Sequence, residues 1–181
     1  MTDAELIKAY QAGDENAFRT LVKRYESRVA ATVIGMLGKC PEAEDVGQET
    51  FIRFHDSLDK FRGESTVGTY ITRIAINLSL NELKRRKRRK FLLLDETNDA
   101  DFGYVNENTG EQIDKKKIVR RAIRKLPPDF RSVIVLRLID GYSTNETAEI
   151  LKLPLGTVLS RLARAQKKLK KILAPYAEEL V

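Results

Sequence analysis

The side chains best suited to chemistry line one face of the last predicted helix, residues 157–173. At about 100° per residue, one side of this helix is apolar and should pack inward, through Val158, Leu162, Ala165, Leu169 and Ile172. The other side carries hydroxyl and basic groups: Thr157, Ser160, Arg161, Arg164, Lys167, Lys168 and Lys171. Hydroxyls and arginine suit base edges in a major groove, and the lysines suit phosphates. A merely solvated basic face is the alternative.

A second polar stripe is predicted on a helix that runs from about Val67 into the basic run "KRRKRRK", residues 84–90. The stripe consists of Tyr70, Arg73, Asn77, Asn81 and Lys84, and Ile71, Ile74, Ala75 and Leu78 face away from it. An aromatic ring, amides and cations on one stripe suit single-stranded nucleic acid. Ser65 and Thr66 in the preceding loop "FRGEST" could cup an unstacked base, and the basic run could hold phosphates. A surface helix with incidental polar residues is the alternative.

A third predicted helix, starting at Pro41, has an acidic outer face. Its buried face consists of Ala43, Val46, Gly47, Thr50, Phe51, Phe54 and Leu58, and the opposite face carries Asp45, Gln48, Glu49, Ile52 and Asp56. Acidic groups around an apolar anchor suit a basic protein surface better than a nucleic acid. A metal-dependent nuclease also uses clustered carboxylates, but Asp45 and Glu49 at i, i+4 lack a further convergent ligand.

The composition argues against a cofactor, a metal site and a membrane segment. One His and one Cys make a zinc site unfavourable, and the single Cys40 cannot form an internal disulfide, which favours a reducing compartment. No apolar run approaches about 18 residues, and the first residues lack the pattern of a signal peptide. The sequence therefore predicts a cytoplasmic protein without membrane insertion, cofactor or metal.

Charge is distributed in blocks along the 181 residues, whose net charge is +7. Residues 1–83 carry −3, residues 84–90 carry +7, residues 91–114 carry −7 and residues 115–181 carry +10. Such segregation indicates modules with different partners, of which at least one is a polyanion.

The elements that position these side chains are predicted to be all helical. No stretch shows sustained period-two alternation, and the apolar residues recur at helical spacing. Asp14 should cap the second helix, and Ser143 with Glu146 has the spacing of a capping box. The turn "KLPLG" then joins two helices in a helix-turn-helix pattern. We expect an all-α fold of two small domains, 1–90 and 113–181, joined by a flexible acidic linker, 91–112.

The blocks that contain these stripes resemble a known family. The stretch "EAEDVGQETFIRFHDSLDKFRGESTVGTYITRIAINLSLNELKRRKRR" resembles the second conserved region of bacterial sigma factors of the extracytoplasmic-function (ECF) group. The stretch "LPPDFRSVIVLRLIDGYSTNETAEILKLPLGTVLSRLARAQKKLKKIL" resembles their fourth region. Both blocks occur in the order and spacing of that family and together cover nearly the whole chain.

The resemblance implies a role for each stripe. The acidic helix would dock on the coiled-coil clamp helices of the largest subunit of core RNA polymerase, with contacts at Asp45, Gln48, Glu49, Ile52 and Asp56. The second stripe, with its loop, would read and melt the −10 promoter element through Ser65, Thr66, Tyr70, Arg73, Asn77, Asn81 and Lys84. The last helix would read the −35 element through Thr157, Ser160, Arg161, Arg164, Lys167 and Lys168. The acidic linker would thread through the polymerase cleft.

The resemblance further implies a transcription initiation factor that is not an enzyme, whose partners are core RNA polymerase, promoter DNA and an anti-sigma factor. The two domains would reposition between the free and the polymerase-bound states. The chain departs from the family pattern in several places: Gly47 stands where a larger aliphatic is common, "TVGTY" lacks the usual bulky residue before Tyr70, Tyr70 replaces a common tryptophan, and Leu159 stands where a basic residue is frequent. An autonomous helix-turn-helix regulator, dimeric and binding operator DNA alone, is the alternative. The acidic face and acidic linker argue against it.

Overall fold

The fold is known from a computed structural model, which describes residues 1–93 and 115–177. In the N-terminal part, α1 spans Asp3–Gln11, α2 Glu15–Leu37, α3 Pro41–Leu58 and α4 Val67–Leu93. In the C-terminal part, α5 spans Lys115–Arg124, α6 Pro128–Ile134, the π-helical turn η1 Val135–Ile139, α7 Thr144–Leu151, α8 Leu155–Leu173 and the 3₁₀ turn η2 Ala174–Tyr176. The described residues contain no strand, so the all-α prediction is confirmed.

Local sequence signals explain several helix boundaries. Asp14 caps α2 by accepting from the Asn16 backbone N–H at 2.9 Å, and Pro41 occupies the first turn of α3. Ser143 and Glu146 form the capping box of α7, with both reciprocal bonds present. Gly141, at φ 76°, ends the helical run α6–η1 in a conformation that favours glycine. The predicted linker, 91–112, lies outside the described residues except for its first three, which continue α4.

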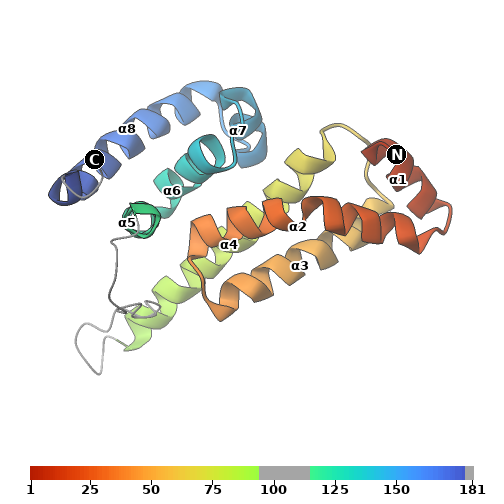
Figure 1. Cartoon of the computed structure of the whole chain (residues 1–181), viewed down its shortest axis with the longest axis horizontal. Helices are drawn as coiled ribbons and strands as arrows, with labels where there is room; N and C mark the ends of the chain where they lie inside the picture. The colour runs from red at the N-terminus through yellow and green to blue at the C-terminus, as the bar shows by residue number, and fades with distance from the viewer. Residues whose placement is uncertain (94–114, 178–181) are drawn as a thin grey trace.

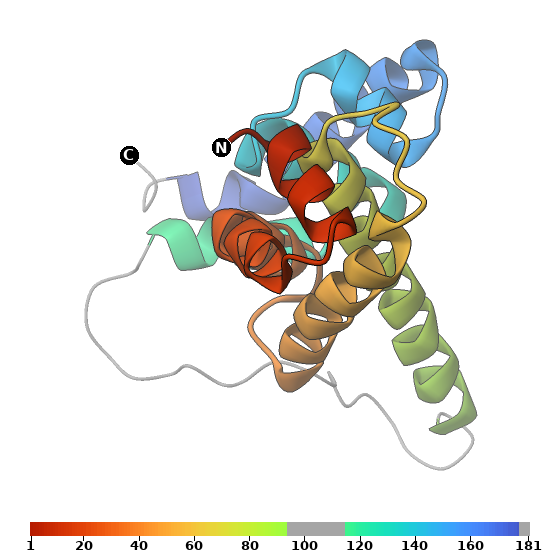
Figure 2. The same cartoon turned by 90° about the vertical axis from the view of Figure 1, so that its right-hand side faces the viewer.

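The N-terminal and C-terminal helices share one continuous apolar core. Figures 1 and 2 show α5–α8 stacked against the pair α2 and α4, while α3 lies on the far side of α2 and α1 packs at one end of α2. At the closest approach, η1 packs on α2 beside Gly35, where an added Cβ would lie 3.0 Å from Val135 Cγ1. A side chain at position 35 would therefore push the two halves apart. No helix in the described ranges combines the length and apolar character needed to span a membrane.

Candidate protein and nucleic-acid interfaces

The acidic face of α3, defined as Asp45, Gln48, Glu49, Ile52 and Asp56, projects from a firmly packed helix. Ala43, Phe54 and Leu58 on the opposite side are buried in the core. Ile52 is 56% exposed, so this face presents a large apolar side chain to water. Glu49 is less available to a partner than the spacing predicted, because its Oε1 accepts a hydrogen bond from Arg53 Nε at 2.7 Å. This i, i+4 pair places a cation at the edge of the acidic face.

A groove of about 330 Å³ joins the acidic face of α3 to α4. Its walls come from both helices: Glu42, Asp45, Val46, Glu49, Arg53, Leu78, Asn81, Glu82 and Arg85. The groove therefore brings Asp45 and Glu49 beside Asn81, so the predicted protein-binding face and the predicted nucleic-acid stripe share one edge.

The α4 stripe is less evenly exposed to solvent than its spacing predicted. It is defined as Tyr70, Arg73, Asn77, Asn81 and Lys84. Asn77, Asn81 and Lys84 are exposed, whereas Tyr70 and Arg73 are half-buried. The Tyr70 ring packs edge-on against Phe61, with centroids 5.1 Å apart, and lies 6.3 Å from Phe54. Part of the ring is thus packed against other aromatic side chains, and Tyr70 is less available for stacking than a fully exposed ring.

Thr66 caps the first turn of α4, a role that the sequence analysis did not predict. Its Oγ1 accepts from the Thr69 backbone N–H at 3.1 Å and donates to Thr69 Oγ1 at 3.0 Å. Thr66 therefore caps the start of α4, and its hydroxyl is already engaged. The neighbouring Ser65 is half-buried and close to this first turn.

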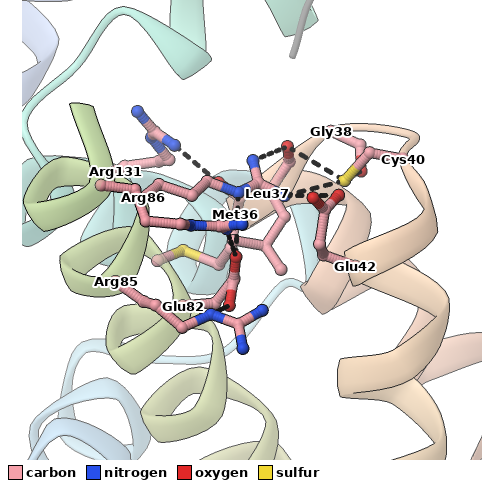
Figure 3. Close-up of polar contacts among 10 residues, drawn as sticks. Met36, Leu37, Gly38, Cys40, Glu42, Glu82, Arg85, Arg86 and Arg131 are labelled. Atoms are coloured by element: carbon pink, nitrogen blue, oxygen red, sulfur yellow. Dashed lines mark hydrogen bonds and ion pairs between the residues drawn. The ribbon is translucent and has the colours of Figure 1, made fainter. Parts of the chain in front are cut away.

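The basic run 84–90 divides into a structural part and an exposed part. Figure 3 shows Arg86 turned back toward the junction of α2 and α3, where it donates to Cys40 Sγ at 3.0 Å and to Glu42 Oε2 at 3.3 Å. Glu82, 7% exposed, accepts from Arg86 Nε at 3.2 Å and also pairs with Arg85 and Arg89. Arg86 thus braces three helices and is unsuited to phosphate binding. The Glu82–Arg86 spacing of i, i+4 was the sequence signal for this.

The basic face of α8, defined as Thr157, Ser160, Arg161, Arg164, Lys167 and Lys168, lies opposite buried Val158 and Ala165. Ser160, Arg164, Lys167 and Lys168 are exposed. Arg161 is half-buried and lies 3.4 Å from Asp129 of α6, and Ser160 Oγ donates to the Thr157 carbonyl at 3.0 Å. The helix-turn-helix predicted from the sequence is therefore present. Arg161, at the edge of the basic face, is paired with Asp129.

Contacts between the two halves involve the α4 stripe itself. Arg73 Nη2 donates to the Glu149 backbone carbonyl at 3.1 Å and lies 3.4 Å from Glu149 Oε1. Next to it, the Tyr142 hydroxyl lies 2.8 Å from Thr72 Oγ1 and donates to the Gly68 carbonyl at 3.2 Å. The helix-turn-helix unit thus covers the first turns of α4.

Further interdomain contacts lie on α2. Thr32 Oγ1 donates to Asp140 Oδ2 at 2.8 Å, and the Arg28 guanidinium stands 5.6 Å from the centroid of the Tyr142 ring. Burial raises the pKa of Asp140 to about 6, against the opposing effects of the Thr32 hydrogen bond and the Arg28 charge. No spacing in the sequence signals these contacts, because they join residues more than 100 positions apart.

Known proteins share both halves of this chain. The model of Sigma-70 region 2 matches residues 21–89, and that of Sigma-70 region 4 matches residues 116–169. The RNA polymerase sigma-H factor of Pseudomonas aeruginosa is 33% identical over 98% of this chain and 96% of its own length. The ECF RNA polymerase sigma-E factor of Escherichia coli is 35% identical over 97% of this chain and 96% of its own length.

Two solved structures have the same fold. CnrH, solved in complex with the cytosolic domain of CnrY, is 25% identical with a TM-score of 0.71, covering 96% of this chain and 97% of its own. The sigma factor RpoE of Bartonella quintana, solved with the anti-sigma factor NepR, is 22% identical with a TM-score of 0.69, covering 87% and 96%.

The fold and its surfaces define a two-region helical transcription initiation factor. The chain belongs to the extracytoplasmic-function sigma factors of bacterial RNA polymerase.

Proposed function

We propose that this chain acts in the cytoplasm, binds core RNA polymerase through the acidic face of α3, and directs initiation at promoters with matching −10 and −35 elements. Polymerase supplies the metal and the catalysis, and the chain positions polymerase on the promoter. The observation that carries the proposal is the shared edge of α3 and α4, where Asp45 and Glu49 line one groove with Asn81. A factor that presents single-stranded DNA to polymerase requires its protein contact and its DNA contact side by side.

The exposed part of the α4 stripe is the proposed −10 contact. Asn77, Asn81 and Lys84 are accessible, and their amides and ammonium group suit base edges and phosphate. Tyr70 contributes the exposed part of its ring. An autonomous regulator would need no acidic face beside this stripe, and the family match over both regions does not favour that alternative.

On α8, Arg164 is the proposed principal base or phosphate contact in the −35 element. We expect Arg164→Ala to weaken binding of the polymerase–sigma complex to promoter DNA about 10-fold to 100-fold, because one good arginine contact to a base contributes about 1–3 kcal/mol. Lys168→Ala should weaken binding on all sequences alike and lower the salt slope by about 1. Titration of labelled promoter fragments at several salt concentrations measures both effects. Equal loss of specificity in both variants would contradict this assignment.

The contacts between α4 and α7 imply that the two halves separate on polymerase. Arg73 belongs to the α4 stripe, yet it is bonded to Glu149 of the helix-turn-helix unit. The −10 and −35 elements lie apart on promoter DNA, so the two reading helices must move apart to engage both. We infer that the arrangement described above is that of the free chain. An anti-sigma factor is the proposed partner that keeps the polymerase-binding surfaces covered.

The buried Asp140 makes this separation sensitive to pH. Its pKa is raised from 3.8 to about 6 in the closed arrangement, so that arrangement binds more protons than an open one in which Asp140 is solvated. The closed arrangement therefore becomes less stable relative to the open one as pH rises from about 4 to about 6, and this loss persists above that range. Small-angle scattering should give a larger mean radius of gyration at pH 7.5 than at pH 4.5.

Asp140→Asn removes this titration while keeping a group that can bond Thr32. We expect the variant to favour the closed arrangement about 100-fold more than the wild type at pH 7.5, and to show a radius independent of pH over this range. An unchanged pH response in Asp140→Asn would show that other groups govern it.

A further inference from the structure

The start of α8 has an apolar edge that the basic face does not explain. Leu155 is 44% exposed and Leu159 is 51% exposed, and Ala163 continues the line at the next i+4 position. Gly156 lies beside them with no atom within 4 Å of the place where a Cβ would stand. This apolar edge, defined as Leu155, Leu159 and Ala163, is open to solvent along two turns of the helix.

The leucines of this edge are not needed to hold the helix in place. Val158 and Ala165 are fully buried against the rest of the domain and, with half-buried Leu162, anchor α8. A single exposed leucine is ordinary in proteins, whereas these two lie in successive turns of a helix whose other exposed side chains are small, polar or basic. The neighbouring Ser160 hydroxyl donates to the Thr157 carbonyl, which leaves the two leucines as the largest free groups beside it.

The charge around the apolar edge identifies what covers it. Ser160, Arg164 and Lys167 follow it around the helix, and all three are exposed. If these side chains engage DNA, as proposed above, the apolar edge at the helix start enters the same major groove. Of the four bases, only thymine presents an apolar group there, its C5 methyl. Cytosine has only a hydrogen at that position, and its neighbouring C4 amino group would lose its water without gaining an acceptor.

We propose that Leu155 and Leu159 read thymine methyl groups in the −35 element. The proposal rests on the proposed function, and it adds specificity-determining residues to it. A leucine at position 159 offers the facing base pair an apolar contact and no hydrogen bond. The preference at the facing base pair should accordingly be for thymine.

Deoxyuridine tests this directly, because it differs from thymidine only by the C5 methyl. The best −35 element is first selected by wild-type polymerase–sigma complex from a promoter library, and each thymine on either strand is then replaced by deoxyuridine. We expect one or two replacements to lower wild-type affinity about fourfold, the effect of losing one buried methyl. Leu155→Ala/Leu159→Ala should bind the methylated element more weakly than the wild type and show no further loss on any deoxyuridine element.

Leu138→Ala provides the matched control, because Leu138 is 56% exposed on η1, outside α8. It should keep the full deoxyuridine sensitivity of the wild type. A fourfold loss that persists in Leu155→Ala/Leu159→Ala would overturn the proposal, as would a wild type indifferent to every replacement. Leu159→Ala lowering transcription equally on all promoters would overturn it too, in favour of a protein on this edge. Failure of the proposed function looks different: the wild type would then give no promoter-specific transcript at all.

Discussion

Polymerase binding is expected to fall at least about 100-fold when Asp45 and Glu49 are both changed to lysine. Both carboxylates lie on the acidic face of α3 and line the groove toward α4. Reversing them places positive charge against the basic clamp surface proposed as partner, and like-charge contacts across an interface each cost several kcal/mol. Titration of labelled core polymerase with Asp45→Lys/Glu49→Lys measures the loss. The fold should be unaffected, because neither side chain is buried.

The matched control is Glu15→Lys/Glu26→Lys, which changes the net charge by the same amount through two exposed residues of α2. This control should bind polymerase within about threefold of the wild type, since surface charges away from an interface contribute little. If both double variants lose affinity equally, the effect belongs to net charge and the assignment of the acidic face is wrong. Ile52→Ala adds an independent check, because it removes the exposed apolar anchor without changing charge.

The largest expected loss of stability follows from removing the Arg131 guanidinium. Arg131 is 8% exposed, and it donates to the Met36 carbonyl at 2.6 Å, to the Leu126 carbonyl at 3.1 Å and to the Arg124 carbonyl. It therefore caps the ends of α2 and α5 together. Arg131→Met keeps the apolar stem and leaves these carbonyls without that donor, which should cost about 3 kcal/mol or more. Calorimetry should show the melting temperature about 10 °C lower.

Arg120→Met makes the same chemical change at an exposed position of α5. It should alter the free energy of unfolding by no more than about 0.5 kcal/mol. Because Arg131 bonds across the two halves, Arg131→Met should also weaken the closed arrangement, which scattering would detect as a larger radius of gyration. Equal melting temperatures for the two variants would contradict the capping role.

Features governed by local chemistry could be predicted from the sequence. The capping box at Ser143 and Glu146, the cap at Asp14 and the inward face of α3 all follow from spacing within one or two helical turns. The division of α8 into an apolar and a basic side follows in the same way, because helical periodicity alone decides it. These are also the features that carry the family resemblance.

Contacts between distant segments could not be predicted. The half-buried positions of Tyr70 and Arg73 depend on Phe61 and on Glu149, which helical spacing within α4 does not involve. The bond between Thr32 and Asp140 spans 108 positions, and nothing in either segment indicates the other. In the basic run, charge alone predicted phosphate binding for all seven residues, whereas Arg86 is drawn inward by Glu82, Glu42 and Cys40.

The central claim is that this chain gives core RNA polymerase its choice of promoter. The most direct test is run-off transcription with purified core polymerase on a library of promoter fragments, with and without the wild-type chain. The account predicts transcripts from a discrete subset that shares a −10 and a −35 element, and only when the chain is present. No chain-dependent transcripts, together with tight binding of the chain alone to a DNA site, would contradict the account and identify an autonomous regulator.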